Sequence, residues 1–217
     1  MSPVVDTIIA VLLAYLIGSI PFGYLIARFI KGIDIRQHGS GNIGATNVGR
    51  VLGKKWGILA LLLDLIKALL PTWLLPVWLL PDPAWTEHVA IACGVAAIMG
   101  HMYPCWLWLR GGKGVASACG VVAYLAPVST AIACGVFVST ILIWRIVSLS
   151  SMLASISFAA VHLILNSDHL WSPGSWSLTL FSLAIPTLIV VRHRSNLVRL
   201  WRGEEPTYRT AKESSGA

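Results

Sequence analysis

Long runs of uncharged apolar residues constrain this chain more than any other feature. The first, Ile8–Ala27, holds 20 residues without a charged side chain, which is the length that a helix needs to cross a bilayer. Over the 217 residues, 56% are hydrophobic and 12% are charged, whereas a soluble domain carries roughly 25% charged residues. The composition excludes a water-soluble enzyme, a nucleic-acid-binding domain and a disordered chain, and it indicates a polytopic membrane protein.

The apolar pattern predicts an all-α fold with about seven transmembrane helices. The expected helices are Ile8–Ala27, Gly57–Leu80, Val89–Leu109, Val115–Leu125, Val128–Trp144, Ser151–Leu165 and Leu178–Val191. Ala126 precedes a proline and therefore resists the helical conformation, so we expect the stretch 115–144 to form a short helical hairpin. We expect Trp171 and Trp176 to extend the last helix as interfacial anchors.

The basic side chains fall on one side of this predicted pattern. Of the 16 Lys and Arg residues, only Lys67 lies within an expected helix. The connections 81–88 and 166–175 contain no Lys or Arg. By the positive-inside rule the base-rich side is cytoplasmic, so the N-terminus lies outside and the C-terminus inside. A single helix in place of the hairpin would move Arg145 and the basic tail to the opposite side.

The domain organisation expected from this pattern is simple. We predict one transmembrane domain over residues 1–205 and a polar, loosely ordered tail over residues 206–217. The four cysteines stand singly in apolar stretches, and no Cys/His cluster has zinc spacing. We therefore predict no disulfide, no metal and no cofactor.

Three polar segments on the predicted cytoplasmic side are the candidate site. The first, His38–Arg50, combines small polar residues and glycines with a basic side chain, and Asp34 is the only acid nearby. Turns of this composition direct successive N–H groups towards an anion. The alternative is a flexible loop with surface bases.

The second segment is Arg110–Gly114, directly before an expected helix. A glycine-rich turn that leads into a helix N-terminus favours phosphate, and Lys113 adds a full positive charge. The spacing does not match a Walker A motif.

The third segment, His193–Leu200, precedes Gly203 and Glu205. Its apolar residues at helical spacing, flanked by arginines, predict an amphipathic helix at the membrane surface. His193 and Asn196 lie three residues apart and so share one helix face, where they can also bind a ligand. The two interpretations are compatible.

Polar residues within the expected helices need their own interpretation. Asp64 and Lys67 are three residues apart, and we predict that they form a structural ion pair. His101, near the cytoplasmic end of its helix, is equally compatible with packing and with a role in the site.

At these segments the chain resembles the bacterial acyl-phosphate:glycerol-3-phosphate acyltransferases, the PlsY family. The matching residues are Ser40-Gly41-Asn42-x-Gly44-Ala45-Thr46-Asn47-x-x-Arg50-x-Leu52-Gly53, Asp64-x-x-Lys67, Gly100-His101-x-x-Pro104, Gly111-Gly112-Lys113-Gly114-Val115-Ala116, Arg145-x-Val147-Ser148, His193-Arg194-x-Asn196, Arg199-Leu200 and Gly203-x-Glu205. Ser117 stands where threonine is usual, and Leu197 where isoleucine is usual.

The resemblance implies a membrane enzyme of the bacterial cytoplasmic (inner) membrane whose site faces the cytoplasm. It would move a fatty acyl group from acyl phosphate to the 1-hydroxyl of glycerol 3-phosphate, giving lysophosphatidic acid and phosphate. This is the first acylation step of bacterial phospholipid synthesis. The resemblance implies no cofactor and no nucleic acid, with the lipid bilayer as a partner, and a monomer would suffice because the site needs one chain.

The resemblance also implies roles for individual residues. Catalytic roles fall to Ser40, Arg50, Lys113, His193 and Asn196. Substrate-binding roles fall to Gly41, Asn42, Gly44, Thr46, Asn47, Gly111, Gly112, Gly114, Arg145, Ser148 and Glu205. We expect a phosphate oxygen of the donor, in preference to His193, to accept the hydroxyl proton. Which pocket holds which phosphate stays open. The competing classes are a membrane transporter for an organic phosphate and a lipid-binding scaffold.

Overall fold

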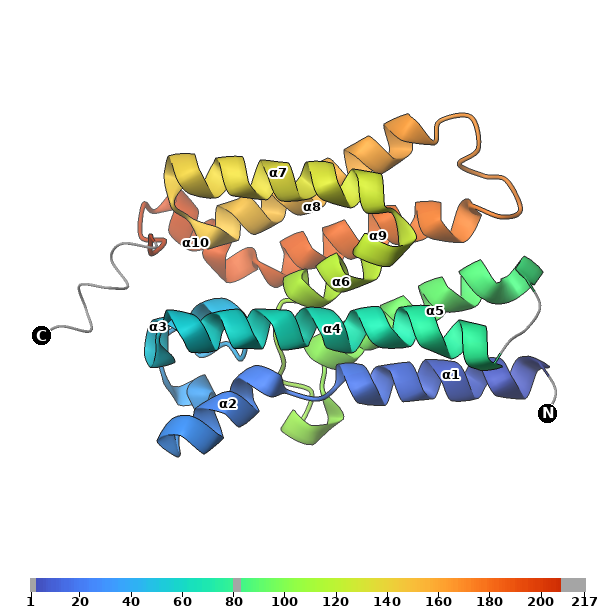
Figure 1. Cartoon of the computed structure of the whole chain (residues 1–217). Helices are drawn as coiled ribbons and strands as arrows, with labels where there is room; N and C mark the ends of the chain where they lie inside the picture. Colours follow the sequence, from blue (N-terminus) through green and yellow to red (C-terminus); the bar gives the residue numbers. More distant parts are fainter. Residues whose placement is uncertain (1–2, 80–82, 208–217) are drawn as a thin grey trace, which may run out of the picture. The chain divides into compact units, whose positions relative to one another are not determined.

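The computed structural model of the chain describes residues 3–79 and 83–207 (Figure 1). The described residues form α-helices joined by turns and by two short 3-10 helices. They fall into two compact units, of which the first ends at Leu125 and the second begins at Ala126. The tail predicted for residues 206–217 lies almost wholly outside the described residues.

The helices of the first unit surround one long central helix. They are α1 (Pro3–Gly18), α2 (Phe22–Lys31), α3 (Ala45–Leu52), α4 (Lys54–Leu79), α5 (Pro83–Met102) and α6 (Val115–Leu125), with the 3-10 helices η1 (Ile35–Gln37) and η2 (Cys105–Leu107). The second unit contains α7 (Pro127–Trp144), α8 (Val147–Leu165), α9 (Trp176–Arg192) and α10 (Arg194–Trp201).

The first apolar run, predicted as one helix over Ile8–Ala27, forms two helices instead. α1 ends at Gly18 and α2 begins at Phe22. The interruption follows from Pro21, which has no N–H to donate and disfavours a helical conformation of the residue before it. Together the two helices still make a 29-residue apolar stretch, Pro3–Lys31, long enough to span a bilayer.

Helix α4 is the centre of the first unit and packs against α1, α3, α5 and α6. α3 crosses α4 where two glycines meet, since a Cβ added to Gly57 would lie 2.7 Å from the Cα of Gly49. α6 meets α4 one to two turns further on, where the Ser117 hydroxyl donates to the carbonyl of Asp64 at 3.2 Å. Gly57 and Asp64 are seven residues apart, which is about 10 Å along a helix. α4 therefore contacts α3 and α6 at points about 10 Å apart along its axis.

Two parts of the first unit differ from the sequence prediction in where their helices begin and end. The segment His38–Arg50 includes the start of α3, so only its first half is a loop. The helix expected over Val89–Leu109 begins earlier and ends at Met102, because Pro104 restricts the residue before it. The chain then makes η2 before returning towards α5.

In the second unit, α8 packs against both α7 and α9, and α10 follows α9 after a sharp bend. The predicted helix break at Ala126 is confirmed, with φ −146° and ψ 67° at this residue and Pro127 at the start of α7. Trp176 begins α9 as expected, whereas Trp171 lies in the preceding turns, 66% exposed, and does not extend the helix.

Within residues 3–79 and 83–207, five helical stretches are long and apolar enough to cross a bilayer, or six if α9 and α10, bent by 58°, count as one span. α6 has 11 residues and is about 16 Å long, about half of the roughly 30 Å hydrocarbon core, and α9 passes the length test only together with α10. The described residues thus confirm a polytopic, all-helical membrane fold, while the number of spans stays a prediction.

Candidate functional site

Asn47 holds the first polar segment in shape. Its side chain is 1% exposed and its Oδ1 accepts the backbone N–H of Ser40 at 2.8 Å. Its Nδ2 donates to the carbonyls of Asn42 at 2.8 Å and His38 at 3.0 Å. The Asn42 side chain in turn accepts the N–H of Gly44 at 2.8 Å. Both asparagine side chains, predicted to bind substrate, therefore bond the segment itself, and a contact with substrate stays a prediction.

The groups that face outward in this segment are different ones. Ser40, Gly41 and Thr46 are exposed, and Arg50 is half-buried one turn after Thr46, so these last two share a face of α3. Gly44 is the N-cap of α3, and its carbonyl accepts the N–H groups of Asn47 at 3.0 Å and Val48 at 3.2 Å. The amides of Ala45 and Thr46 come before these bonded amides and lie at the N-terminus of α3, where an anion is favoured.

The one acidic side chain close to this segment is neutralised locally. Arg36 Nη2 lies 2.7 Å from Asp34 Oδ2, and this hydrogen-bonded guanidinium lowers the pKa of the Asp34 carboxyl. Arg36 also stacks over the Tyr24 ring, with its Cζ 5.3 Å from the ring centroid. The carboxylate therefore adds little repulsion to an anion near Arg50.

The second segment, Arg110–Gly114, folds back onto the end of α5 through its first two glycines. The N–H of Gly111 donates to the carbonyl of Met102 at 3.2 Å, and that of Gly112 to the carbonyl of His101 at 3.1 Å. These two amides, expected to cradle phosphate, thus satisfy carbonyls at the C-terminus of α5.

What the second segment offers to an anion lies at its end. Lys113 is half-buried, and Gly114, at φ 84°, turns the chain into α6. That positive φ favours glycine, and a Cβ at Gly114 would also overlap the Met102 side chain. Lys113 and the N-terminus of α6 are therefore the groups through which this segment can hold phosphate.

A buried charge cluster underlies the second segment. Lys67 Nζ lies 2.8 Å from Asp64 Oδ1, so the predicted ion pair is confirmed. His101 Nδ1 lies 3.4 Å from the same oxygen. The three side chains are at most 4% exposed, and Lys67 also donates to the carbonyl of Ile20 at 2.7 Å.

Glu205 organises the third segment, in the second unit. Its Oε1 accepts Ser148 Oγ at 2.7 Å and Asn196 Nδ2 at 2.5 Å, and its Oε2 accepts Arg199 Nε at 2.7 Å. The contact brings together the start of α8, helix α10 and the chain that follows α10. Ser148, Asn196 and Glu205, all predicted to take part in the site, are therefore neighbours.

Burial alone would raise the pKa of the Glu205 carboxyl, but the hydrogen bonds from Ser148, Asn196 and Arg199, with the charge of Arg199, outweigh it. The pKa is lowered as a result, and the side chain is a carboxylate at neutral pH. This anion and the Arg199 cation balance each other beside Asn196.

His193 lies 3% exposed at the junction of α9 and α10. Its Nδ1 is 2.8 Å from the carbonyl oxygen of Ile189. A carbonyl can only accept, so Nδ1 carries the proton, and in the neutral ring the lone pair is on Nε2. Nε2 is then the nitrogen that can accept a hydrogen bond from a hydroxyl.

Arg145 ends α7 in the left-handed conformation, at φ 58°, and its side chain is exposed. This conformation costs a non-glycine residue about 1 kcal/mol or more. The turn places Arg145 three residues before Ser148, at the same junction of the second unit.

The sequence alone did not reveal that Arg199 partners Glu205. The signal lay in Gly203, which at φ 70° reverses the chain after α10, so that the N–H of Glu204 donates to the carbonyl of Arg199 at 2.8 Å. The contact of His101 with the second segment gave no sequence signal, because it depends on a chain reversal after Met102.

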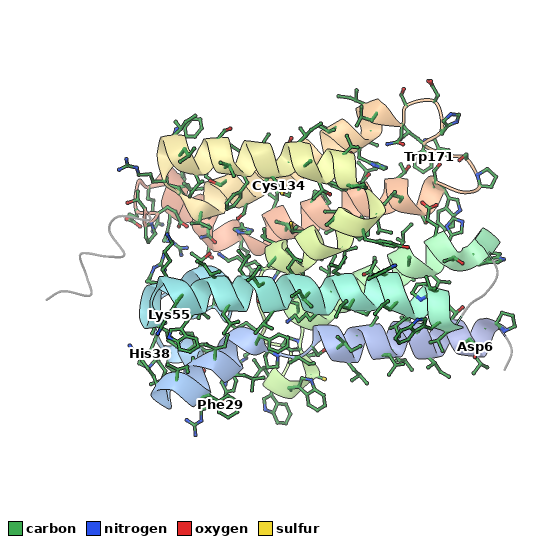
Figure 2. The ribbon with its side chains drawn as sticks, viewed as in Figure 1. Asp6, Phe29, His38, Lys55, Cys134 and Trp171 are labelled. Carbon is green, nitrogen blue, oxygen red and sulfur yellow. The ribbon has the colours of Figure 1, made fainter. Side chains whose placement is uncertain are left out.

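Each unit by itself carries some of its candidate polar groups at one end. In the first unit His38 and Lys55 lie at one end and Asp6 at the other (Figure 2). In the second, α10 lies at the end opposite Trp171 (Figures 1 and 2). Such a fold defines a class: a multi-pass helical membrane protein with glycine-rich, basic segments suited to phosphorylated ligands.

Comparison with known proteins narrows this class to one family. The family model described as glycerol-3-phosphate acyltransferase matches residues 8–203. The glycerol-3-phosphate acyltransferase of Myxococcus xanthus strain DK1622 is 48% identical over 195 residues, covering 90% of this chain and 96% of the relative. That of Anaeromyxobacter sp. strain Fw109-5 is 45% identical over 215 residues, covering 96% and 100%. The chain belongs to the glycerol-3-phosphate acyltransferase family of the PlsY type.

Solved structures agree with this membership. The crystal structure of PlsY (YgiH), an integral membrane glycerol 3-phosphate acyltransferase, in its glycerol 3-phosphate form matches with a TM-score of 0.82 and 38% identity. It covers 93% of this chain and 95% of that one. The lysophosphatidic acid form of the same enzyme matches with a TM-score of 0.79.

Proposed function

We propose that this protein is a membrane acyltransferase that acylates the 1-hydroxyl of glycerol 3-phosphate with an acyl group from acyl phosphate. The observation that carries the proposal is the family match over residues 8–203, which includes all three polar segments. The products would be lysophosphatidic acid and inorganic phosphate. The alternative of a transporter for an organic phosphate gains no support from relatives that are named as acyltransferases.

The chemistry needs two anion-binding places and little else. The glycerol oxygen attacks the acyl carbonyl carbon, the bond from that carbon to the phosphate oxygen breaks, and the hydroxyl proton passes to the departing phosphate. Acyl phosphate is already activated, so positioning, which can lower a barrier by roughly 7–11 kcal/mol, and stabilisation of the developing oxyanion are what the protein supplies.

The outward-facing groups of the first unit suit the donor phosphate and the oxyanion. Lys113, with the N-terminus of α6, holds one phosphate, while Arg50 and Ser40 hold a phosphate or the oxyanion. α4 supports this assignment because it fixes both α3 and α6, at contact points about 10 Å apart along its axis. Helix α4 thereby keeps the positive charges of Lys113 and Arg50 apart.

The groups of the second unit suit glycerol 3-phosphate. In the proposed arrangement Nε2 of His193 accepts a hydrogen bond from a glycerol hydroxyl, while Asn196 and Ser148 line the place that this substrate occupies. The Glu205 carboxylate would repel the substrate phosphate, so that phosphate lies away from it, towards a base such as Arg145. The hydroxyl proton goes to the donor phosphate rather than to His193.

The charge distribution supports one orientation. With the seven crossings predicted from the sequence, in which the short helix α6 counts as one, the basic side chains fall on one side of the helix pattern, so that the N-terminus lies outside, the C-terminus inside, and the site faces the cytoplasm of a bacterial inner membrane. Figure 2 is consistent with this sidedness, since the acidic Asp6 and the basic Lys55 lie at opposite ends of the first unit. A single chain carries every proposed group, so a monomer suffices.

The test is a direct assay. The protein purified in detergent is mixed with palmitoyl phosphate and glycerol 3-phosphate, and phosphate and lysophosphatidic acid are measured together. We expect equal amounts of the two products, and no lysophosphatidic acid when palmitoyl-CoA replaces the acyl phosphate. Product formation from palmitoyl-CoA at a comparable rate would contradict the donor assignment, and folded protein with no product from either donor would contradict the enzyme proposal.

A further inference from the structure

The buried cluster of Asp64, Lys67 and His101 takes no part in the proposed chemistry. The side chains of Asp64 and Lys67 are each 2% exposed, and that of His101 is 3% exposed. Charged groups at this depth are costly in a membrane protein. A buried ion pair also adds little net stability compared with apolar residues of similar size. Stability alone is therefore a weak reason for three ionisable groups in the middle of the first unit.

The cluster touches the second segment through His101. The imidazole packs against the Cα of Gly112, and a Cβ added there would overlap the ring, with Nε2 as its nearest atom. The backbone of the same pair is bonded, with the N–H of Gly112 3.1 Å from the carbonyl of His101. Lys113 is the next residue, so the place of its backbone is determined by the ring beneath Gly112.

Asp64 in turn sets the ring. Its Oδ1 lies 3.4 Å from His101 Nδ1 and 2.8 Å from Lys67 Nζ. The carboxylate therefore stands between an imidazole and an ammonium, and it orients the ring that supports the glycine turn. This is how a carboxylate beside a histidine fixes the ring in many sites.

Lys67 connects the cluster to the first segment. Its Nζ donates to the carbonyl of Ile20 at 2.7 Å, at the break between α1 and α2. α2 continues from that break, and a Cβ on its Gly23 would overlap the carbonyl of Ile43, inside the first segment. One buried cluster thus contacts the supports of both segments of the first unit.

We propose that Asp64, Lys67 and His101 form a positioning network for the acyltransferase site, in which His101 holds Gly112 and thereby places the Lys113 ammonium for phosphate. The network touches no substrate and acts through the backbone of the second segment. The inference rests on the proposed function only in the experiments that measure turnover.

The first test is a double-mutant cycle in the full-length protein in detergent. His101→Ala should lower kcat/KM by about 10- to 100-fold, mainly through the KM of one phosphorylated substrate, since small misplacements of a binding group cost that much. In a Lys113→Ala background the same change should cost less than about twofold. Full additivity of the two substitutions would overturn the proposal.

Two further variants separate positioning from folding. His101→Gln reaches the position of Nε2 beneath Gly112 and should recover part of the lost kcat/KM. His162→Ala, which removes a histidine that is 4% exposed in α8 of the second unit, is the control for loss of a buried imidazole and should leave KM unchanged. A loss in His101→Ala that follows only the unfolding temperature, with no rescue by glutamine, would contradict the proposal.

Hydrogen exchange supplies a readout that does not depend on activity. In His101→Ala the amides of Gly111 and Gly112 should exchange about tenfold faster than in the wild type, because the turn opens locally, while those of α9 stay unchanged. Unchanged exchange at Gly111 and Gly112 would overturn the positioning role even if turnover fell. If the wild type showed no turnover, the proposed function would fail while this measurement still decided the inference.

Discussion

Replacing Glu205 by glutamine keeps the size of the side chain and removes its charge. The carboxylate accepts three hydrogen bonds, from Ser148, Asn196 and Arg199, and its side chain is 7% exposed. A glutamine oxygen can keep the bonds on Oε1, but its NH₂ group faces the Arg199 Nε, which is also a donor. The substitution therefore removes one charge-assisted bond and adds a donor–donor contact.

The expected cost follows from these contacts. A hydrogen bond to a charged group is worth about 1.5–3 kcal/mol, and the ion pair itself adds at most about 1 kcal/mol because Arg199 is 36% exposed. We expect Glu205→Gln to lower the free energy of unfolding by about 2–3 kcal/mol, which corresponds to about 4–12 °C in the unfolding midpoint for a chain of this size.

Activity should fall with it, because the contact fixes Asn196 and the start of α8. We expect kcat/KM for glycerol 3-phosphate to drop about 10- to 100-fold, measured in the phosphate-release assay at a temperature where both proteins are folded. Glu204→Gln is the matched control, since the neighbouring Glu204 is exposed. If Glu205→Gln behaved like Glu204→Gln in both stability and KM, the role derived for the carboxylate would be refuted.

Three other expectations can be checked with the same assays. Lys113→Ala should lower turnover about 100-fold or more because it removes a charge from the phosphate site, whereas Lys55→Ala should stay near the wild-type rate; equal turnover of the two variants would refute the Lys113 assignment. Gly57→Ala should lower the free energy of unfolding by about 1–3 kcal/mol because its Cβ would collide with the backbone of α3. Gly135→Ala, whose Cβ meets open space, should leave the free energy of unfolding unchanged. A thermal melt of each variant distinguishes the two outcomes. The pKa of Glu205 is lowered in the folded state, so its stabilising contribution is present above the ordinary glutamate pKa and lost as the pH falls through the folded value. The unfolding midpoint of the wild type should therefore fall on acidification more than that of Glu205→Gln, and parallel pH curves would contradict this.

Local patterns in the sequence predicted most of the helices. The break at Ala126 follows from a single residue, and the structure confirms it; of the two tryptophans expected to extend the last helix, Trp176 does so and Trp171 does not. The interruption at Pro21 was missed because the apolar run continues across it without a change of composition. The early end of α5 was missed for the same reason, since the apolar residues continue beyond Pro104.

The sequence predicted which residues belong to the candidate site, but not which hydrogen bonds they make. Glycines, asparagines and bases in three segments indicated phosphate; the family match includes these segments, and their contacts with substrate stay a prediction. That Asn47 bonds its own segment could not be known, because an asparagine looks the same in sequence whether it faces a ligand or its own backbone. The amides of Gly111 and Gly112 raise the same difficulty, and only the return of the chain to α5 shows where they donate.

The sequence by itself determined that this is a multi-pass helical membrane protein with basic, glycine-rich segments, because run length, charge position and glycine placement act locally. Tertiary structure alone decided which polar groups support others and which face outward. Lys67 reaches Ile20 across 47 residues, and Ser148 reaches Glu205 across 57. A buried polar group must find a partner, and contacts at that separation depend on how the helices pack, which no local pattern records.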